Sequence, residues 1–267
     1  MSIGHGERLI ALPGAFNLRD VGGYPAAGGR VTRWRTLLRS GSLHLAGPAG
    51  AAELARFGLR TVVDLRTFEE AERSPDPALG AAQRRVGLLG EDLAVLPVSL
   101  DGVYRFVISE RGSYVGAAVR HLCAPGALPA LVHCSAGKDR TGLIIALVLA
   151  AIGVPDDVLA ADYALSADAL GRYAAAAVGQ LRAVMPEDGD PHDDPEDDGL
   201  GLDLGPGNDR GLPADPESAL LDSPPELILS ILAQVRASDG DSAGYLARNG
   251  VPPAALAALR DAVTEPE

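Results

Sequence analysis

The chain has 267 residues, of which 47% are hydrophobic and 22% charged, and it carries a formal net charge of −13 at pH 7. This composition is that of a globular protein with a sizeable core, and the acidic balance excludes broad nucleic-acid binding, which needs a basic face. No apolar run reaches the roughly 20 residues that span a bilayer, and residues 1–9 lack the apolar region of a signal peptide, so we expect no integral membrane association.

Cysteine usage indicates the cellular compartment. The two cysteines, Cys123 and Cys134, are too few for a disulfide scaffold. Free thiols persist in reducing compartments, so we expect a cytoplasmic protein. Export by a route that needs no signal peptide is compatible with the same sequence.

The N-terminal half of the chain alternates short apolar strands with short helices. Gly28 and Gly29 separate a turn-rich segment from the first strand and predict a small hairpin. The expected strands cover 31–38, 61–65, 86–89, 95–98 and 130–132, and the expected helices cover 49–57, 104–108, 114–122 and 141–152. This alternation predicts an α/β fold in which helices flank a mostly parallel central sheet.

Beyond residue 154 the sequence predicts helices alone. They cover 155–165, 168–184, 225–236, 242–248 and 253–263. We therefore expect one domain, with a core over 1–154 and a helical lid with closing helices over 155–267. Residues 186–224 predict a mobile acidic insert, since 187–198 hold eight acidic residues and no Lys or Arg. The spacing of these acids does not match a calcium loop, and we predict no metal site there.

The stretch over 133–142 reads HCSAGKDRTG and joins the strand over 130–132 to a helix. A strand, a small-residue loop and a helix N-terminus direct backbone N–H groups toward an anion. Such donors hold phosphoryl oxygens and depress the pKa of a thiol, which makes Cys134 the candidate nucleophile. Arg140 supplies a fork-shaped clamp for phosphate. We predict that this loop carries the chemistry of the protein.

The same residues suggest a reaction sequence. A thiolate attacks phosphorus in line, and water later hydrolyses the phosphocysteine. The leaving oxygen needs a proton from a carboxylic acid across the cleft. Asp64, at the end of a neighbouring strand, is expected in the same crevice, because open sheets bind ligands at the carboxyl ends of their strands. Thr141 can donate a hydrogen bond to the sulfur and ease its departure.

Two arginines earlier in the chain have two interpretations. Arg19 and Arg39 both lie in segments rich in turn residues. They either provide turn and surface charge or line an anionic site.

The HCSAGKDRTG stretch resembles the signature of cysteine-dependent protein tyrosine phosphatases, and its GKDRTG portion is similar to that of the bacterial atypical tyrosine and phosphoinositide phosphatases. Residues 16–23 (FNLRDVGG), 38–41 (LRSG), 63–66 (VDLR) and 244–246 (GYL) also resemble segments of that family. The resemblance covers most of the chain apart from the acidic insert. It implies an α/β phosphatase fold with a helical lid and no metal or other cofactor.

The resemblance also implies substrates and residue roles. The substrates are phosphotyrosine, phosphoserine or phosphothreonine, and phosphoinositides, with inorganic phosphate as the product. Asp139 is the general acid from within the loop, whereas phosphatases with a separate acid loop keep Asp64 as a second candidate. Lys138, the only lysine of the chain, is an extra cation for a second phosphate. The residues expected to bind the substrate phosphate are Ser135, Ala136, Gly137, Lys138, Asp139 and Arg140.

Two other classes of function use a similar loop. A rhodanese-like sulfurtransferase or an arsenate reductase also places a cysteine in an anion-binding loop, but Arg140 and Thr141 favour phosphate chemistry. A catalytically inactive module that binds phosphorylated ligands is the non-enzymatic alternative.

Overall fold

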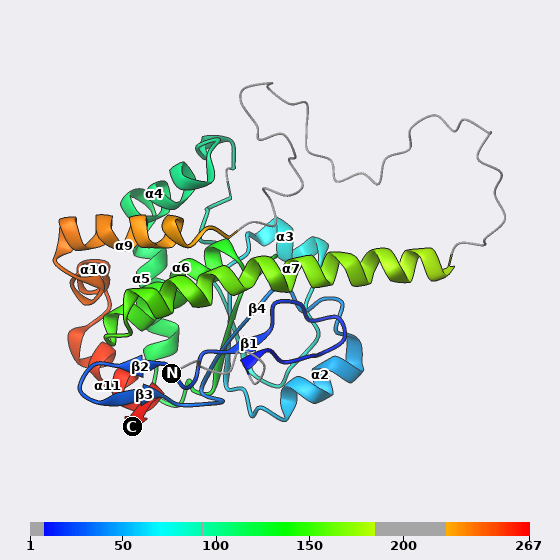
Figure 1. Cartoon of the computed structure of the whole chain (residues 1–267), viewed down its shortest axis with the longest axis horizontal. Coiled ribbons are helices and arrows are strands. Elements are labelled where there is room, and N and C mark those ends of the chain that lie inside the picture. The colour runs from blue at the N-terminus through cyan, green and yellow to red at the C-terminus, as the bar shows by residue number, and fades with distance from the viewer. Residues whose placement is uncertain (1–7, 92, 185–222) are drawn as a thin grey trace.

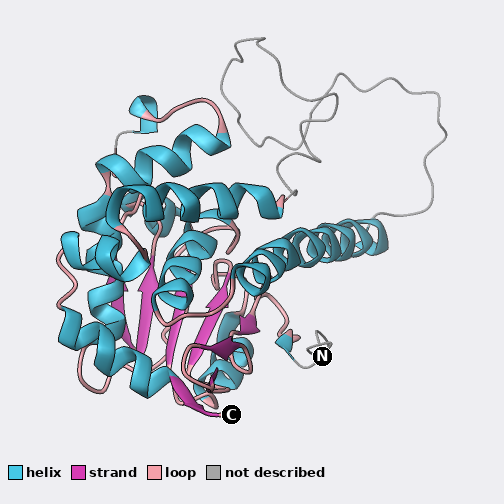
Figure 2. Cartoon of the chain, turned by 60° about the vertical axis from the view of Figure 1, so that its left-hand side comes forward, coloured by secondary structure: helices cyan, strands magenta, loops and turns pink. Residues whose placement is uncertain are grey.

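The computed structural model describes residues 8–91, 93–184 and 223–267 (Figure 1). The predicted acidic insert over 186–224 lies outside the described residues, except for its last two positions. The described helices and strands form an α/β fold, in which helices surround a central sheet (Figure 2).

The central sheet has five strands in the order β1–β4–β7–β5–β6. Their bounds are β1 Arg19–Asp20, β4 Leu37–Ser40, β7 Ala130–His133, β5 Thr61–Asp64 and β6 Ala82–Arg85. All neighbouring pairs are parallel except β1 with β4, so the prediction of a mostly parallel sheet is confirmed. Strand β7 is central, and its last residue, His133, lies in register with Ser40 on one side and Asp64 on the other.

A small second sheet joins the two ends of the chain. It contains β2 (Pro25–Ala26), β3 (Arg30–Thr32) and β8 (Thr264–Pro266). The turn at Gly28 and Gly29 links β2 to β3, as the glycines predicted, because both adopt the positive φ that glycine tolerates. The expected strand over 31–38 is divided, since its last residues enter the central sheet as β4.

The helices fall on the two faces of the sheet. Their bounds are α2 Gly47–Ala55, α3 Phe68–Arg73, α4 Leu100–Glu110, α5 Gly112–Cys123, α6 Asp139–Ala151, α7 Asp156–Val184, α9 Pro225–Asp239, α10 Ser242–Arg248 and α11 Pro253–Val263. Helix α6 is buried over nearly its whole length, because the other helices of the larger core surround it. Helix α2 covers the smaller core on the opposite face. None of the described helices combines the length and apolarity needed to cross a lipid bilayer.

Alternate residues of the central strands belong to different cores. Val63 and Val132 pack in the larger core with α6, whereas Val62 and Leu131 pack in the smaller one with α2. This alternation follows from the two-residue period of a strand. Cys134 belongs to the larger core, and therefore faces the side of α6.

Three boundaries differ from the predictions. The helices expected over 155–165 and 168–184 form the single helix α7, because the residues between them contain neither Gly nor Pro. The strand expected over 86–89 is found earlier, as β6, whose residues are exposed and lack an apolar pattern. The segment 95–98 is no strand: a 3₁₀ helix (η1, Leu93–Val95) ends there, and Val98 is fully exposed after a proline.

Candidate active site

The loop over 134–138, the candidate catalytic loop, connects β7 to α6 and carries the sulfur of Cys134. The thiol is buried, and the backbone N–H of Gly137 donates a hydrogen bond to Sγ at 3.3 Å. Gly137 has φ +70°, and a Cβ there would lie 2.4 Å from the backbone nitrogen of Gly41. Only glycine fits this position, because the loop turns through a left-handed conformation against the end of β4. The turn at Gly137 therefore brings a backbone N–H to the thiol.

Arg140 lies in the first turn of α6 and is held by Glu70 of α3. Its Nη1 is 2.6 Å from Oε2 of Glu70 and its Nη2 is 2.7 Å from Oε1. The hydroxyl of Ser135 also donates to Oε1, at 2.6 Å. This bidentate pair is the geometry in which a guanidinium grips a planar anion.

The electrostatics of Glu70 follow from these contacts. Burial raises its pKa, but hydrogen bonds and charge from Arg140, with donors from Ser135 and the Thr67 amide, outweigh burial and lower the pKa to about 2. Burial lowers the pKa of Arg140, but Glu70 more than compensates and raises it. Both groups are charged at neutral pH. Glu70 was not predicted as a site residue; the only signal was the capping pattern that it forms with Thr67 at the start of α3.

Asp139 begins α6 and faces α4. Its Oδ1 accepts a hydrogen bond from the Tyr104 hydroxyl at 3.1 Å, and Tyr104 is in turn hydrogen-bonded to the Tyr163 hydroxyl at 2.8 Å. Burial raises the pKa of Asp139, and the nearby charge of Lys138 only partly offsets the shift. A cavity of about 20 Å³, room for roughly one water, lies between Asp139, Arg140 and α4. A carboxyl with a raised pKa in such a site can hold a proton.

Two neighbours of Asp139 lie differently from what the sequence suggested. Lys138 is expected to face a second phosphate, but its side chain is only 3% exposed and its Nζ lies 3.7 Å from Oδ1 of Asp139. Thr141 is fully buried, and within the described part of the chain its hydroxyl has no hydrogen-bond partner. The predicted bond from Thr141 to Cys134 Sγ is thus not formed in this structure.

Asp64 lies on the other face of the sheet from Cys134. It is in register with His133, the residue before Cys134, and side chains alternate along a strand. Both of its carboxylate oxygens pair with Arg66, at 2.9 Å from Nε and from Nη2. Burial raises the pKa of Asp64, but the hydrogen bonds from Arg66 outweigh it and lower the pKa. The structure does not bring Asp64 to the sulfur, in contrast to the sequence expectation of a shared crevice.

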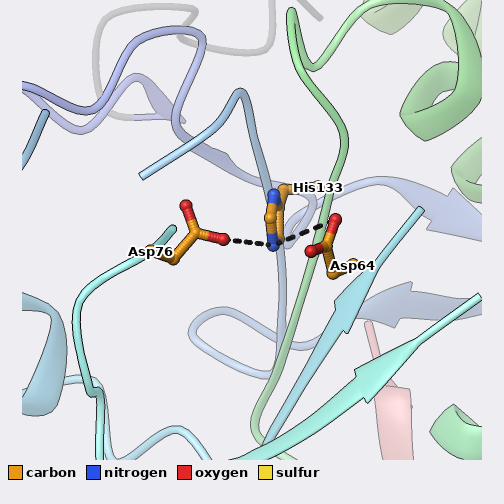
Figure 3. Close-up of side chains that lie close together, drawn as sticks. All are labelled: Asp64, Asp76 and His133. Carbon is orange, nitrogen blue, oxygen red and sulfur yellow. Dashed lines mark ion pairs between the residues drawn. The ribbon is translucent and has the colours of Figure 1, made fainter. Parts of the chain in front are cut away.

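Asp64 instead belongs to a buried cluster with Asp76 and His133 (Figure 3). Nε2 of His133 points between the two carboxylates, 3.4 Å from Asp76 and 3.9 Å from Asp64. The three groups could each offer one atom to a metal ion, since these atoms lie within 4.8 Å of one another. However, the guanidinium of Arg66 already pairs with both carboxylates. A cation would have to displace that arginine, so we assign the cluster to the support of β7 and not to metal binding.

Arg19 and Arg39 neither lie on the surface nor line the mouth of the site. Both are fully buried beneath the catalytic loop and share one carboxylate, Asp162 of α7. Arg39 also donates to the Gly137 carbonyl of the loop at 2.8 Å. These arginines are therefore part of the support of the loop.

Comparison with known proteins agrees with this geometry. The sequence profile of the tyrosine phosphatase family matches residues 10–265, nearly the whole chain. The chain belongs to the tyrosine phosphatase family.

Curated relatives carry corresponding names. A putative tyrosine-protein phosphatase of Cupriavidus necator is 35% identical over 176 residues, which cover 59% of this chain and 63% of that protein. The triple specificity protein phosphatase PtpB of Mycobacterium tuberculosis is 34% identical over 213 residues, which cover 66% of this chain and 72% of PtpB. A crystal structure of P. aeruginosa TpbA in complex with pTyr matches with a TM-score of 0.30 and 20% identity, covering 51% of this chain and 71% of that one.

Proposed function

We propose that this protein hydrolyses phosphomonoesters through a phosphocysteine intermediate, with Cys134 as the nucleophile and Arg140 as the phosphate clamp. The observation that carries the proposal is the Gly137 N–H donated to Cys134 Sγ, in a loop that begins a buried helix. Backbone N–H groups at a helix N-terminus stabilise both a thiolate and the oxygens of a phosphoryl group. Family membership supports the same chemistry.

The reaction needs two proton transfers, which we assign to Asp139. The Cys134 sulfur attacks phosphorus, the P–O bond of the ester breaks, and protonated Asp139 gives its proton to the leaving oxygen. Water then attacks the phosphocysteine, Asp139 takes a proton from it, and inorganic phosphate and the thiolate are released. The raised pKa of Asp139 supports this role, because the acid must be protonated at the start of each turnover.

The substrate proposal rests on the relatives and on the loop. PtpB is named a triple specificity phosphatase, which supports phosphotyrosine, phosphoserine or phosphothreonine, and phosphoinositides as substrates here. Lys138 would meet a second phosphate of an inositol head group after its side chain turns away from Asp139. We also propose the cytoplasm as the compartment, because a nucleophilic thiol must stay reduced.

The decisive experiment compares the wild-type protein with the Cys134→Ser variant. We expect the wild type to hydrolyse p-nitrophenyl phosphate with an initial burst of p-nitrophenol, because the phosphocysteine accumulates when its hydrolysis is slow. Cys134→Ser should lose turnover while its circular dichroism and phosphate binding are retained. Turnover that survives in Cys134→Ser contradicts the mechanism. A wild type that binds phosphate but does not hydrolyse esters indicates a binding module instead.

A screen of phosphopeptides against phosphoinositides then tests the substrate range. If the proposal is correct, Lys138→Ala loses more activity toward phosphoinositides that carry two adjacent phosphates than toward phosphotyrosine peptides. Equal losses on both classes contradict a role of Lys138 in binding a second phosphate. Thiosulfate and arsenate assays on the same samples test the sulfurtransferase and arsenate reductase alternatives.

A further inference from the structure

A buried ion-pair network lies directly beneath the catalytic loop. Nη1 of Arg39 is 2.5 Å from Oδ2 of Asp162, and Nε of Arg19 is 3.1 Å from Oδ1 of the same residue. The Tyr24 hydroxyl donates to Oδ1 as well, at 2.9 Å. All three charged side chains are almost completely buried. Two guanidinium groups thus share one carboxylate in the interior.

Burying these charges makes the free energy of folding less favourable. Removing a charge from water carries a desolvation penalty, and a buried ion pair is often no better than well-packed apolar residues. Here the charges do not balance, since two cations face one anion. The pKa of Arg19 is lowered to about 10 by burial and by the neighbouring Arg39. Folding alone does not explain why the chain keeps this cluster.

The hydrogen bonds from this cluster to the loop explain why it lies beneath the loop. Nη2 of Arg39 donates to the carbonyl of Gly137 at 2.8 Å and more weakly to that of Lys138 at 3.4 Å. Asn17, which is hydrogen-bonded to Arg19, donates from Nδ2 to the carbonyl of Ala136 at 3.1 Å. The three consecutive backbone carbonyls of residues 136–138 therefore accept hydrogen bonds from Asn17 and Arg39.

A hydrogen bond to a carbonyl oxygen also orients the N–H group of the same peptide unit. A trans peptide unit is planar, and its C=O and N–H point in opposite directions. The peptide between Ala136 and Gly137 shows the consequence: Asn17 holds its oxygen, and its N–H donates to Cys134 Sγ. Arg39 holds the next peptide in the same way, which directs the N–H of Lys138 away from the arginine. Each hydrogen bond to a loop carbonyl thus fixes the direction of the N–H group in the same peptide unit.

We infer that Asp162 and Arg39 are positioning residues for the loop over 134–138: Asp162, on helix α7, fixes the guanidinium of Arg39, and Arg39 fixes the peptide that follows the one donating to the sulfur. Helix α7 runs past β1 and β4, the strands that carry the two arginines (Figure 1). The position of α7 is thereby coupled to the geometry of the loop through Arg39, since within the described residues the hydrogen bonds of the Asp162 carboxylate go to Arg19, Arg39 and Tyr24. This inference deepens the proposed phosphatase function and rests on it.

The test measures phosphate binding and catalysis in variants of both residues. Inorganic phosphate is titrated calorimetrically into Cys134→Ser proteins that carry Arg39→Met, Arg39→Lys or Asp162→Asn, and kinetics are measured in the same variants with Cys134 present. Loss of a charge-assisted hydrogen bond predicts a roughly tenfold or larger drop in phosphate affinity for Arg39→Met. Arg39→Lys keeps the positive charge but not the paired N–H donors of the guanidinium, and should recover part of the lost phosphate affinity.

Arg8→Met is the matched control. Arg8 is also fully buried, but its hydrogen bonds within the described residues go to the backbone carbonyls of Asp20 and Gly22 and not to the loop. The Arg8→Met substitution should lower the melting temperature and leave the phosphate affinity unchanged. Asp162→Asn should weaken phosphate binding in the same direction as Arg39→Met, although Asp162 does not contact the loop.

The outcomes separate this inference from the proposed function. Wild-type phosphate affinity in folded Arg39→Met and Asp162→Asn overturns the inference, even if the wild type is an active phosphatase. If Arg39→Met does not fold, wild-type affinity in both Arg39→Lys and Asp162→Asn overturns it equally. A wild type without hydrolytic activity refutes the proposed function, whereas the calorimetric titration still reports whether Arg39 shapes the loop.

Discussion

Glu70 and Arg140 form a bidentate ion pair across the catalytic site, with Nη–Oε distances of 2.6 and 2.7 Å. The carboxylate takes the terminal edge of the guanidinium, formed by Nη1 and Nη2. Nη2 also donates to the Ser135 hydroxyl at 3.3 Å, and the pair with Glu70 does not use the Nε–H donor. Glu70 therefore orients the guanidinium of Arg140.

The first prediction concerns this pair. Glu70→Gln keeps the size of the side chain but replaces a charge-assisted, two-point contact by a neutral one. Hydrogen bonds to charged groups contribute about 1.5–3 kcal/mol, so we expect kcat/KM for p-nitrophenyl phosphate to fall roughly 10- to 100-fold. Glu69→Gln is the control, because Glu69 is exposed and pairs with Arg73 on the surface. Equal kinetics in both variants contradict an orienting role of Glu70.

The same variant predicts a pH dependence of stability. The pKa of Glu70 is lowered from 4.5 to about 2, so its charge stabilises the folded state at pH values above 4.5, and this contribution is lost as the pH falls through about 2. Urea unfolding of wild type and Glu70→Gln should differ by a constant amount from pH 5 to 7, and the difference should shrink below pH 4.5. A difference that grows toward acid pH is incompatible with the lowered pKa.

Local sequence features were sufficient for much of the fold. The β-branched run of β5, the apolar run of β7 and the glycine pair at 28–29 predicted their elements, because each element carries its signal in a short run of its own residues. The exposed edge strand β6 was missed, since its side chains carry no apolar alternation. Helix α7 was predicted as two helices, but Ser166, between them, lies within the single helix, and its hydroxyl accepts a hydrogen bond from the buried Arg19.

The supports of the site could not be predicted from sequence. The loop itself is contiguous, and its cysteine, glycine and arginine could be proposed from their chemistry and their place between a predicted strand and a predicted helix. Glu70 is 70 residues from Arg140, and Asp162 is 123 residues from Arg39, and no local pattern links such pairs. Asp64 illustrates the same limit: the sequence placed it at the right edge of the sheet, but only the strand register shows that it points to the other face.

The second prediction tests Asp139 as the general acid. In Asp139→Asn, aryl phosphates with poor leaving groups should lose about 10²- to 10⁴-fold in rate, whereas p-nitrophenyl phosphate, whose leaving group needs little protonation, should lose far less. The measurement is the dependence of kcat on leaving-group pKa for wild type and variant. Asp64→Asn should change both substrates alike, because Asp64 pairs with Arg66 and does not face the sulfur. A leaving-group effect confined to Asp64→Asn would reverse the assignment.

The third prediction uses the contact between Lys138 and Asp139. The ammonium lies 3.7 Å from Oδ1 and opposes the rise that burial causes in the Asp139 pKa. Lys138→Met removes this cation, so the pKa of Asp139 should rise further and the acid should stay protonated to higher pH. The alkaline limb of the kcat–pH profile is therefore expected to move to higher pH in Lys138→Met and to stay near its wild-type position in Lys138→Arg. Movement to lower pH in Lys138→Met contradicts the proposed electrostatics.

The last prediction concerns the backbone of the loop. Gly137 and Gly126 have nearly the same positive φ, +70° and +72°, but a Cβ on Gly137 would lie 2.4 Å from backbone atoms at the end of β4, whereas none lies within 4 Å at Gly126. Each alanine substitution should cost about 1–2 kcal/mol of stability through the left-handed conformation. Only Gly137→Ala should also displace the peptide that donates to Cys134 Sγ, and a shift of about 1 Å in a catalytic group can lower the rate roughly 100-fold. Chemical denaturation and kcat/KM of the two variants separate the strain from the displacement, because Gly126→Ala supplies the strain alone. Similar kcat/KM values in both would show that the N–H of Gly137 is not needed at the sulfur.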